Sequence, residues 1–172
     1  KKSLLINLGG GVISYLGGFV ASTYKRGIDF INIPTTLLSI TDASVGGKTG
    51  VDFEGIKNHI GTISEPKGIF VNLEFLKTLS ERHIKNGYAE IIKIALIADA
   101  DFWKILKKQS TVKDFCNEGI IIKAIELKNS IVKKDLHEKD IRKSLNFGHS
   151  IGHALESALL KQGKDILHGE AI

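Results

Sequence analysis

The sequence predicts an α/β part followed by an all-helical part, with a boundary near residue 80. Before the boundary, short β-branched runs alternate with glycine-rich turns and helical segments, which is typical of α/β folds. After it the turns disappear, and apolar residues recur at helical spacing. We therefore expect partial domains over residues 1–80 and 81–172, with the functional site in the cleft between them.

The first elements of the chain predict a phosphate-binding turn. A strand-like run, Leu4–Leu8, is followed by the glycines Gly9–Gly11 and by a helical pattern over Val12–Tyr24. In a Rossmann-like fold the backbone N–H groups of such a turn face a pyrophosphate. The match to G-x-G-x-x-G is imperfect because Ser14 replaces the third glycine, so a plain tight turn remains the alternative.

A second glycine cluster lies at Val45–Gly50. It resembles the end of a Walker loop but lacks the spacing and the preceding strand of that motif, so we reject an ATPase. What remains is a flexible backbone with polar neighbours. Such neighbours suit the binding of phosphate or sugar hydroxyls. They are Asp42, Lys48, Lys57 and Asn58.

Short β-branched runs predict the remaining strands, and apolar residues at helical spacing predict the remaining helices. A polar stripe marks the last helix, because Arg142, Asn146, His149 and His153 fall on one of its faces. Gly148 inside this helix costs about 1 kcal/mol relative to alanine, which indicates close approach by another group. We expect strands at 30–33 and 69–72, and helices at 82–98, 101–108, 118–136 and 141–159.

A carboxylate and three imidazoles make a metal centre possible. His149 and His153 form an H-x-x-x-H pair, Glu90 lies in a helical segment among apolar neighbours, and His168 adds a third imidazole. A carboxylate and two histidines would leave zinc an open position for a substrate. Surface histidines and an ordinary ion pair between Glu90 and Lys93 are the alternatives.

Composition favours an ordinary globular protein, with 42% hydrophobic and 25% charged residues in 172. No apolar stretch approaches the roughly 20 residues that cross a bilayer, and no signal-peptide pattern opens the chain, so we expect a cytoplasmic protein with no membrane partner. The net charge of +5 is spread along the chain, which favours an anionic small molecule over nucleic acid. The single cysteine, Cys116, excludes an internal disulfide framework.

Seven sequence blocks resemble, in order, those of the 3-dehydroquinate synthase family, and together they extend over essentially the whole chain. The resemblance implies a lyase that uses NAD and zinc, with cobalt as the alternative metal. It implies that the metal is held by Glu90, His149 and His168. The blocks are Gly9–Val12, Pro34–Leu38, Asp42–Gly50, Lys57–Asn58, Ala89–Lys93, Asn146–His149 and His168–Ala171.

The resemblance also implies where NAD would bind, along the glycine turn and the segments beside it. One departure from the family lies there, because Ser14 and Tyr15 stand where the family has glycine and aspartate. The implied cofactor-binding residues are Gly10, Gly11, Val12, Ile13, Ser14, Tyr15, Thr35, Thr36, Asp42, Lys48, Lys57, Phe75, Leu76, Lys77 and Thr78.

The implied reaction is phosphate elimination and cyclisation of 3-deoxy-D-arabino-heptulosonate 7-phosphate to 3-dehydroquinate, in the shikimate pathway to chorismate and the aromatic amino acids. The substrate carboxylate would pair with Lys128 and Arg142. The other implied catalytic residues, which hold the phosphate or position hydroxyls and move protons, are Lys48, Asn58, Lys93, Asn146 and His153. Arg26 resembles an arginine that reaches the phosphate across a homodimer.

Three alternatives remain open. Another sugar phosphate cyclase, such as one making an aminocyclitol precursor (2-deoxy-scyllo-inosose synthase-like), would have a substrate without a carboxylate partner for Lys128 and Arg142. A metal-dependent polyol dehydrogenase would accumulate NADH. A non-catalytic protein that binds anions or nucleic acid would need neither the metal set nor a reactive cofactor.

Overall fold

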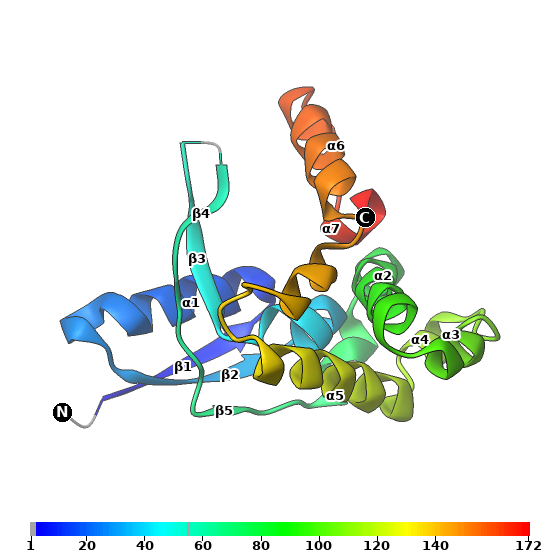
Figure 1. The fold of residues 1–172 in the computed structure, drawn as a ribbon, viewed down its shortest axis with the longest axis horizontal. Coiled ribbons are helices and arrows are strands. Elements are labelled where there is room, and N and C mark those ends of the chain that lie inside the picture. The colour runs from blue at the N-terminus through cyan, green and yellow to red at the C-terminus, as the bar shows by residue number, and fades with distance from the viewer. Residues whose placement is uncertain (1–2, 55) are drawn as a thin grey trace.

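The computed structural model describes residues 3–54 and 56–172. These residues form a mixed α/β fold with a parallel sheet, an antiparallel hairpin and a group of helices (Figure 1). The described strands lie between residues 4 and 69. The prediction of an α/β fold with parallel strands is therefore confirmed. Among the described helices, none has both the length and the unbroken apolar character that crossing a bilayer requires.

The parallel sheet has the strand order β1-β2-β5. β1 (Leu4–Gly9) pairs with β2 (Asp29–Pro34), and α1 (Gly11–Thr23) connects them and packs on β1. Parallel strands require such a crossover, so the glycine turn at the end of β1 leads directly into a helix. β5 (Gly68–Ile69) extends the sheet beyond β2, but it is shorter than the predicted strand at 69–72.

A β-hairpin follows the second glycine cluster, where the sequence had predicted only flexible backbone. It consists of β3 (Lys48–Phe53) and β4 (Ile56–Ile63), which pair in antiparallel fashion. The hydroxyls of Thr49 and Thr62 lie 2.7 Å apart across the two strands. In Figure 1 the hairpin rises from the body of the molecule beside α1, and α6 rises from the same side.

Helices dominate the second half of the chain, and their starts follow capping rules. The side chain of Ser80 accepts a hydrogen bond from the His83 N–H at the start of α2, and Asn117 does the same for Ile120 at the start of α5. The elements are α2 (Glu81–Ala98), α3 (Ala100–Leu106), α4 (Val112–Phe115), α5 (Glu118–Lys134), α6 (His149–Lys161) and α7 (His168–Ala171).

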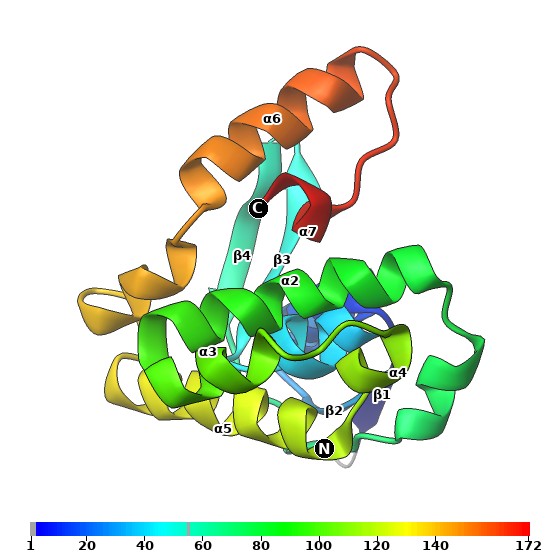
Figure 2. The same ribbon diagram turned by 90° about the vertical axis from the view of Figure 1, so that its right-hand side faces the viewer.

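The main hydrophobic core joins these helices to the first half of the chain. Leu37 and Ile40 are fully buried in the same cluster as Ile91 of α2 and Ile121 of α5. Figure 2 shows α2 lying over α5, with the sheet and the hairpin beyond them. The α/β and helical parts therefore share one core, and a group on α2 keeps a fixed position relative to both.

The prediction of one continuous helix over 141–159 is wrong. Residues Ile141–Asn146 form a 3-10 helix, and α6 begins only at His149. Between them Gly148 has φ +80°, in the left-handed region that favours glycine, so it caps α6 and does not lie within it. As a result, Arg142 and Asn146 do not share a helix face with His149 and His153.

Candidate metal centre and the cationic groups around it

The centre of the site is a buried carboxylate on α2. Glu90 is 1% exposed, and the Lys93 ammonium one turn later pairs with its Oε2. Within the described residues Oε1 of Glu90 has no hydrogen-bond donor, and Oε2 has only the Lys93 ammonium beside it. A buried carboxylate oxygen without a donor is costly, so Oε1 indicates that a further cation belongs beside it.

α7 brings His168 to this carboxylate. The imidazole Nε2 lies 3.6 Å from Glu90 Oε1. The N–H of Gly169 donates a 2.6 Å hydrogen bond to the side chain of Asn86 on α2. A side chain at Gly169 would overlap the Asn86 carbonyl oxygen, so glycine permits the close approach that places His168.

An arginine on α2 also secures the segment around His168. The Arg82 guanidinium donates to Asp165 at 2.6 Å and to Glu170 at 2.7 Å. It thus holds both the loop before α7 and α7 itself. These hydrogen bonds lower the pKa of the Glu170 carboxyl to about 2, so it is ionised at neutral pH.

His149 begins α6 and faces Glu90 from the other side. Its Nε2 lies 3.8 Å from Glu90 Oε1, while its Nδ1 lies 3.2 Å from the Phe147 carbonyl oxygen. That contact fixes the ring if Nδ1 carries the proton, which leaves Nε2 free to act as a ligand. The left-handed turn at Gly148 makes the geometry possible, because it turns the chain just before His149.

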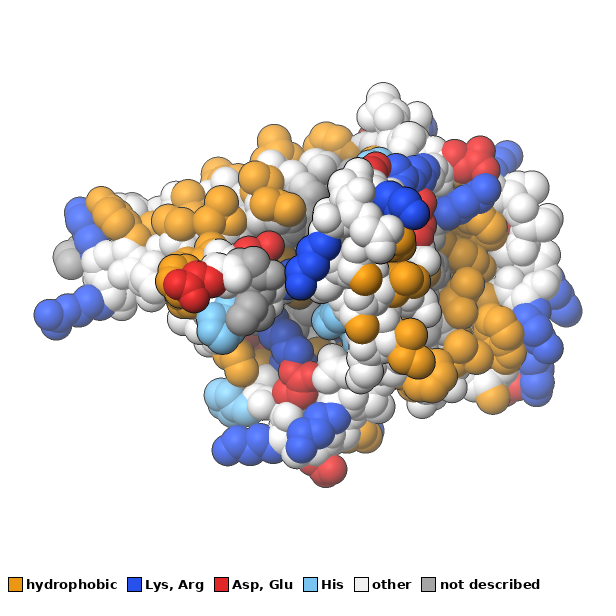
Figure 3. All heavy atoms as spheres, turned by 90° about the horizontal axis from the view of Figure 1, so that it is seen from above, with side chains coloured by type: hydrophobic (Ala, Val, Ile, Leu, Met, Phe, Trp, Pro, Cys, Tyr) orange, Lys and Arg blue, Asp and Glu red, His pale blue; other side chains and the backbone are white. Residues whose placement is uncertain are grey.

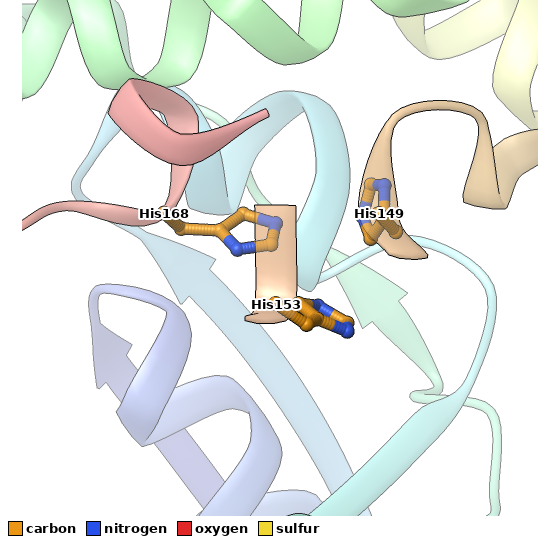
Figure 4. A group of neighbouring side chains, drawn as sticks. All are labelled: His149, His153 and His168. Carbon is orange, nitrogen blue, oxygen red and sulfur yellow. The ribbon is translucent and has the colours of Figure 1, made fainter. Parts of the chain in front are cut away.

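His153, one turn further along α6, completes a group of three imidazoles. Nitrogen atoms of His149, His153 and His168 all lie within 4.8 Å of one another. Figure 4 shows the three rings around a common space, two from α6 and one from α7. The structure thus offers His153 as a further donor beside the predicted set of Glu90, His149 and His168, and the sequence had placed it only among the catalytic residues.

The electrostatics of these groups suit a metal ion. Burial, and then the positive charge of Lys93, lower the pKa of His149. Burial, and then His168, lower the pKa of His153. Both imidazoles are therefore neutral at neutral pH, which is the form that ligates metals. Together with the Glu90 carboxylate, whose Oε1 has no hydrogen-bond donor among the described residues, they fit a divalent cation such as zinc.

A buried ion pair links α5 to the turn before the second glycine cluster. The Lys128 ammonium lies 2.5 Å from both the carboxylate and the backbone carbonyl of Asp42. Burial raises the pKa of Asp42, but the charges of Lys128 and Lys93 and the hydrogen bond from Lys128 together lower it by more, so the pKa lies below its usual range. The structure thus pairs these two predicted site residues with each other.

Arg142 is 2% exposed and fixes the glycine cluster from the opposite side. Its guanidinium donates to the carbonyl oxygens of Gly46 at 2.8 Å and Leu136 at 2.7 Å. Its buried Nε has no hydrogen-bond partner among the described residues. A donor of this group is therefore available to an anion.

One carboxylate that the sequence analysis missed connects two predicted residues. Glu138 forms an ion pair with Lys48 and accepts a 2.5 Å hydrogen bond from the side chain of Asn146. Burial raises the pKa of Glu138, and these partners lower it further than burial raises it. Glu138 is a partly buried loop residue in a stretch rich in acidic and basic residues, so no sequence signal distinguishes it.

A second missed carboxylate, Glu156, joins α6 to the hairpin. Its Oε1 accepts a 2.8 Å hydrogen bond from Lys57 of β4, and its Oε2 lies 3.6 Å from His168 Nδ1. Seen from above, basic, acidic and histidine side chains gather between the hairpin and α6 (Figure 3). The sequence signal was present, since Glu156 follows His149 and His153 at helical spacing.

The predicted cofactor-binding turn lies at the start of α1. Gly10 caps the helix without a side-chain hydrogen bond, and its Cα faces Thr36. The Thr35 N–H donates to the Gly9 carbonyl at 2.9 Å, so the structure brings the threonine pair beside the glycine turn. Val12 and Ile13 are exposed on the first turn, and Ser14 is buried with its hydroxyl 3.1 Å from that of Ser39.

Tyr15, the departure from the family pattern, is influenced by carboxylate charges. Burial, and then the charge of Asp42, raise the pKa of its phenol, with Glu90 adding to the effect. The phenol is therefore neutral at physiological pH and can donate a hydrogen bond.

The remaining predicted residues lie beyond α1, on the hairpin and in a 3-10 helix. Arg26 is exposed beyond the C-terminal end of α1, and Asn58 is exposed in the hairpin, where its N–H donates to Asp52 at 2.7 Å. Within the 3-10 helix Leu73–Thr78, which holds the predicted Phe75, Lys77 and Thr78, Leu76 packs in the hydrophobic core. A hollow of about 430 Å³ lies between α2, α3 and α4, and no predicted site residue lines it.

Fold and site together define a mixed α/β protein that joins a glycine turn to a carboxylate–histidine metal centre. The family model described as "3-dehydroquinate synthase N-terminal" matches residues 1–86, and the model "3-dehydroquinate synthase C-terminal" matches residues 87–172. The chain belongs to the 3-dehydroquinate synthase family.

Curated relatives agree with this result. The chain is 45% identical to a 3-dehydroquinate synthase of Parabacteroides distasonis over 174 residues, and 48% identical to one of Campylobacter fetus over 172 residues. These matches cover 100% of this chain and 49% of each relative. The chain therefore spans about half the length of the curated relatives it matches.

Solved structures of sugar phosphate cyclases are similar. A 2-epi-5-epi-valiolone synthase from Streptomyces hygroscopicus, with NAD+ and Zn2+ bound, matches with a TM-score of 0.90 and 35% identity over 98% of this chain and 48% of that one. A 2-deoxy-scyllo-inosose synthase complexed with carbaglucose-6-phosphate, NAD+ and Co2+ matches with a TM-score of 0.82 and 31% identity, covering 96% of this chain and 46% of that one.

Proposed function

We propose that the protein represented by this chain is a 3-dehydroquinate synthase that uses NAD and a divalent metal, zinc or cobalt. Its substrate would be 3-deoxy-D-arabino-heptulosonate 7-phosphate. The observation that carries the proposal is the convergence of Glu90, His149 and His168 from three separate helices. The names of the relatives support this substrate, and the titles of the structural neighbours support the cofactors.

Bound zinc would polarise a substrate alcohol, and bound NAD would take up and later return a hydride. Glu90 would supply the anionic ligand atom, and the imidazoles of His149 and His168 would supply neutral ones. Lys93 holds the other oxygen of Glu90, so it would orient that carboxylate and present its remaining N–H groups to a substrate hydroxyl. His153, beside both imidazoles, would accept or return a proton as hydroxyl groups ionise.

The basic groups would hold the two anionic ends of the substrate. Arg142 has an unused donor, and Lys128 lies across the same glycine cluster, so they would hold the carboxylate. Lys48, with Asn58 and His153, would hold the phosphate. Lys48 now pairs with Glu138, and a phosphate dianion would compete for it because it carries more charge than a carboxylate.

NAD would bind at the start of α1. The free N–H groups of the first turn and the helix dipole favour its pyrophosphate there. Tyr15 would stand near the reacting end of the cofactor as a neutral donor. The other proposed contacts are Gly10, Gly11, Val12, Ile13, Ser14, Thr35, Thr36, Asp42, Lys48, Lys57, Phe75, Leu76, Lys77 and Thr78.

Two further features belong to the proposal. The chain would comprise a Rossmann-like NAD-binding part over 1–80 and a metal- and substrate-binding helical part over 81–172, which share one core. The protein would act in the cytoplasm as a homodimer. The exposed position of Arg26, beyond the end of α1 remote from the glycine turn, is compatible with a role in a partner's site.

The test is phosphate release by the full-length protein from the heptulosonate phosphate. We expect release that requires NAD, stops with a chelator and produces no net NADH. The likeness to two other cyclases makes a different sugar phosphate the second candidate. Release from a hexose phosphate but not from the heptulosonate phosphate would establish that candidate, whereas accumulation of NADH would indicate a polyol dehydrogenase.

A further inference from the structure

Glu156 lies beside the metal centre, but it has no role in the proposed reaction. It is 8% exposed and is the only acidic residue of α6. One carboxylate oxygen lies 2.8 Å from the ammonium of Lys57, on the hairpin, and the other lies 3.6 Å from Nδ1 of His168, on α7. A single side chain thus contacts both the cofactor side and the metal side of the site.

His168 lies between two carboxylates. Its Nε2 is 3.6 Å from Glu90 Oε1, and its Nδ1 is 3.6 Å from Glu156 Oε2. The Nδ1 atom is buried and has no hydrogen-bond partner within the part of the chain that the structure describes. A neutral imidazole has one N–H and one lone pair, so a carboxylate beside one nitrogen determines which nitrogen keeps the lone pair.

We propose that Glu156 is a positioning residue for the metal centre. It accepts the Nδ1–H of His168, and so directs the lone pair of Nε2 toward the ion beside Glu90. This inference rests on the metal centre of the proposed function. Histidine ligands commonly donate their second nitrogen to a carboxylate, which fixes the ring and increases its basicity.

The chemistry of the carboxylate distinguishes this role from that of a simple tether between α6 and the hairpin. Both oxygens of Glu156 face a donor, Lys57 on one side and His168 on the other. A carboxylate can accept both hydrogen bonds, whereas the amide of glutamine has one accepting oxygen and one donating nitrogen. Glu156→Gln therefore keeps the size of the side chain but can satisfy only one of the two partners.

Removal of Lys57, which competes with His168 for the amide oxygen, should then restore metal binding. In Glu156→Gln the amide oxygen would turn to the ammonium of Lys57, which is the charged donor, and would leave His168 without an acceptor. In the double variant with Lys57→Met, the amide oxygen is free to accept from His168. The double variant should therefore bind metal better than Glu156→Gln alone.

The experiment measures zinc affinity of the full-length protein without substrate or NAD, by competition with a chromophoric chelator. We expect about tenfold weaker binding for Glu156→Gln, recovery of most of that loss in the double variant, and little change for Lys57→Met alone. Glu81→Gln is the matched control, since its ion pair with Lys85 is exposed on α2. The visible spectrum of the cobalt-loaded protein should change most in Glu156→Gln, less in the double variant and little in Lys57→Met.

The outcomes separate the two proposals. If the unchanged protein binds no zinc, the metal centre and the role of Glu156 are both overturned. If it binds zinc and Glu156→Gln binds equally well, only the role of Glu156 is overturned. If Lys57→Met weakens binding as much as Glu156→Gln and the double variant recovers nothing, the carboxylate is a tether and not a positioning residue.

Discussion

Lys128→Met should destabilise the protein by about 3 kcal/mol, because it breaks a buried ion pair. The side chain of Lys128 is 7% exposed, and its ammonium meets both the carboxylate and the carbonyl of Asp42 at 2.5 Å. Loss of one partner from a buried pair costs roughly 3–5 kcal/mol. Asp42 is 21% exposed, so water can reach it after the substitution, which favours the lower end of that range.

The free energy of unfolding of the full-length protein in urea, followed by circular dichroism, measures this cost. Lys123→Met on the same helix is the matched control. Its pair with Asp99 is 3.0 Å long but more exposed, so its loss should cost less than about 1 kcal/mol. Equal effects of the two substitutions would refute the argument from burial.

The dependence of this cost on pH follows from the pKa of Asp42. The folded pKa lies below the unfolded value, so the stabilisation is fully present above the unfolded pKa of about 3.9. It is lost as the pH falls from there toward the folded pKa. The difference between the unchanged protein and Lys128→Met should therefore be constant near neutrality and shrink below about pH 4. A difference that is independent of pH down to acid unfolding would contradict this linkage.

Three further perturbations test the site. Gly169→Ala introduces a methyl group that overlaps the Asn86 carbonyl, so α7 should shift and zinc affinity, measured by chelator competition, should fall at least about tenfold. Arg142→Lys replaces a fork that binds two carbonyls by one ammonium, so KM for the carboxylate substrate should rise about tenfold in steady-state assays, with a smaller change in kcat. Chelation should abolish phosphate release and added zinc should restore it, whereas Glu90→Gln should remain inactive at the same zinc concentration.

The sequence predicted best where one local pattern determined one element. The strand, glycine turn and helix from β1 to α1 were predicted because apolar alternation and helical spacing meet at a glycine run. α2 and α5 were predicted because apolar residues recur along them at helical spacing. The resemblance to a family supplied the residues of the metal centre, and the structure brings Glu90, His149 and His168 together.

The errors arose where periodicity continued across a break in the backbone. A 3-10 turn followed by an α-helix keeps polar residues at nearly helical spacing, so the left-handed conformation of Gly148 was not visible. The hairpin was missed because its strands are rich in glycine and polar residues. Gly50 stands opposite Gly61 there, so this pair contributes no side-chain contact across the strands.

Helix α2 explains why the site needs a cation. Its residues Asn86, Glu90 and Lys93 fall on one stripe, and all are at most 5% exposed. Asn86 accepts from Gly169 and Lys93 pairs with Oε2 of Glu90, yet Oε1 still has no hydrogen-bond donor among the described residues. An apolar side chain at position 90 would avoid that desolvation cost, so stability alone gives no reason for a glutamate. Two imidazoles, those of His149 and His168, face the same carboxylate. Burial lowers the pKa of His149, so this ring would not be protonated to neutralise Glu90 at physiological pH. A divalent ion satisfies all three groups at once, and this makes the burial of Glu90 favourable.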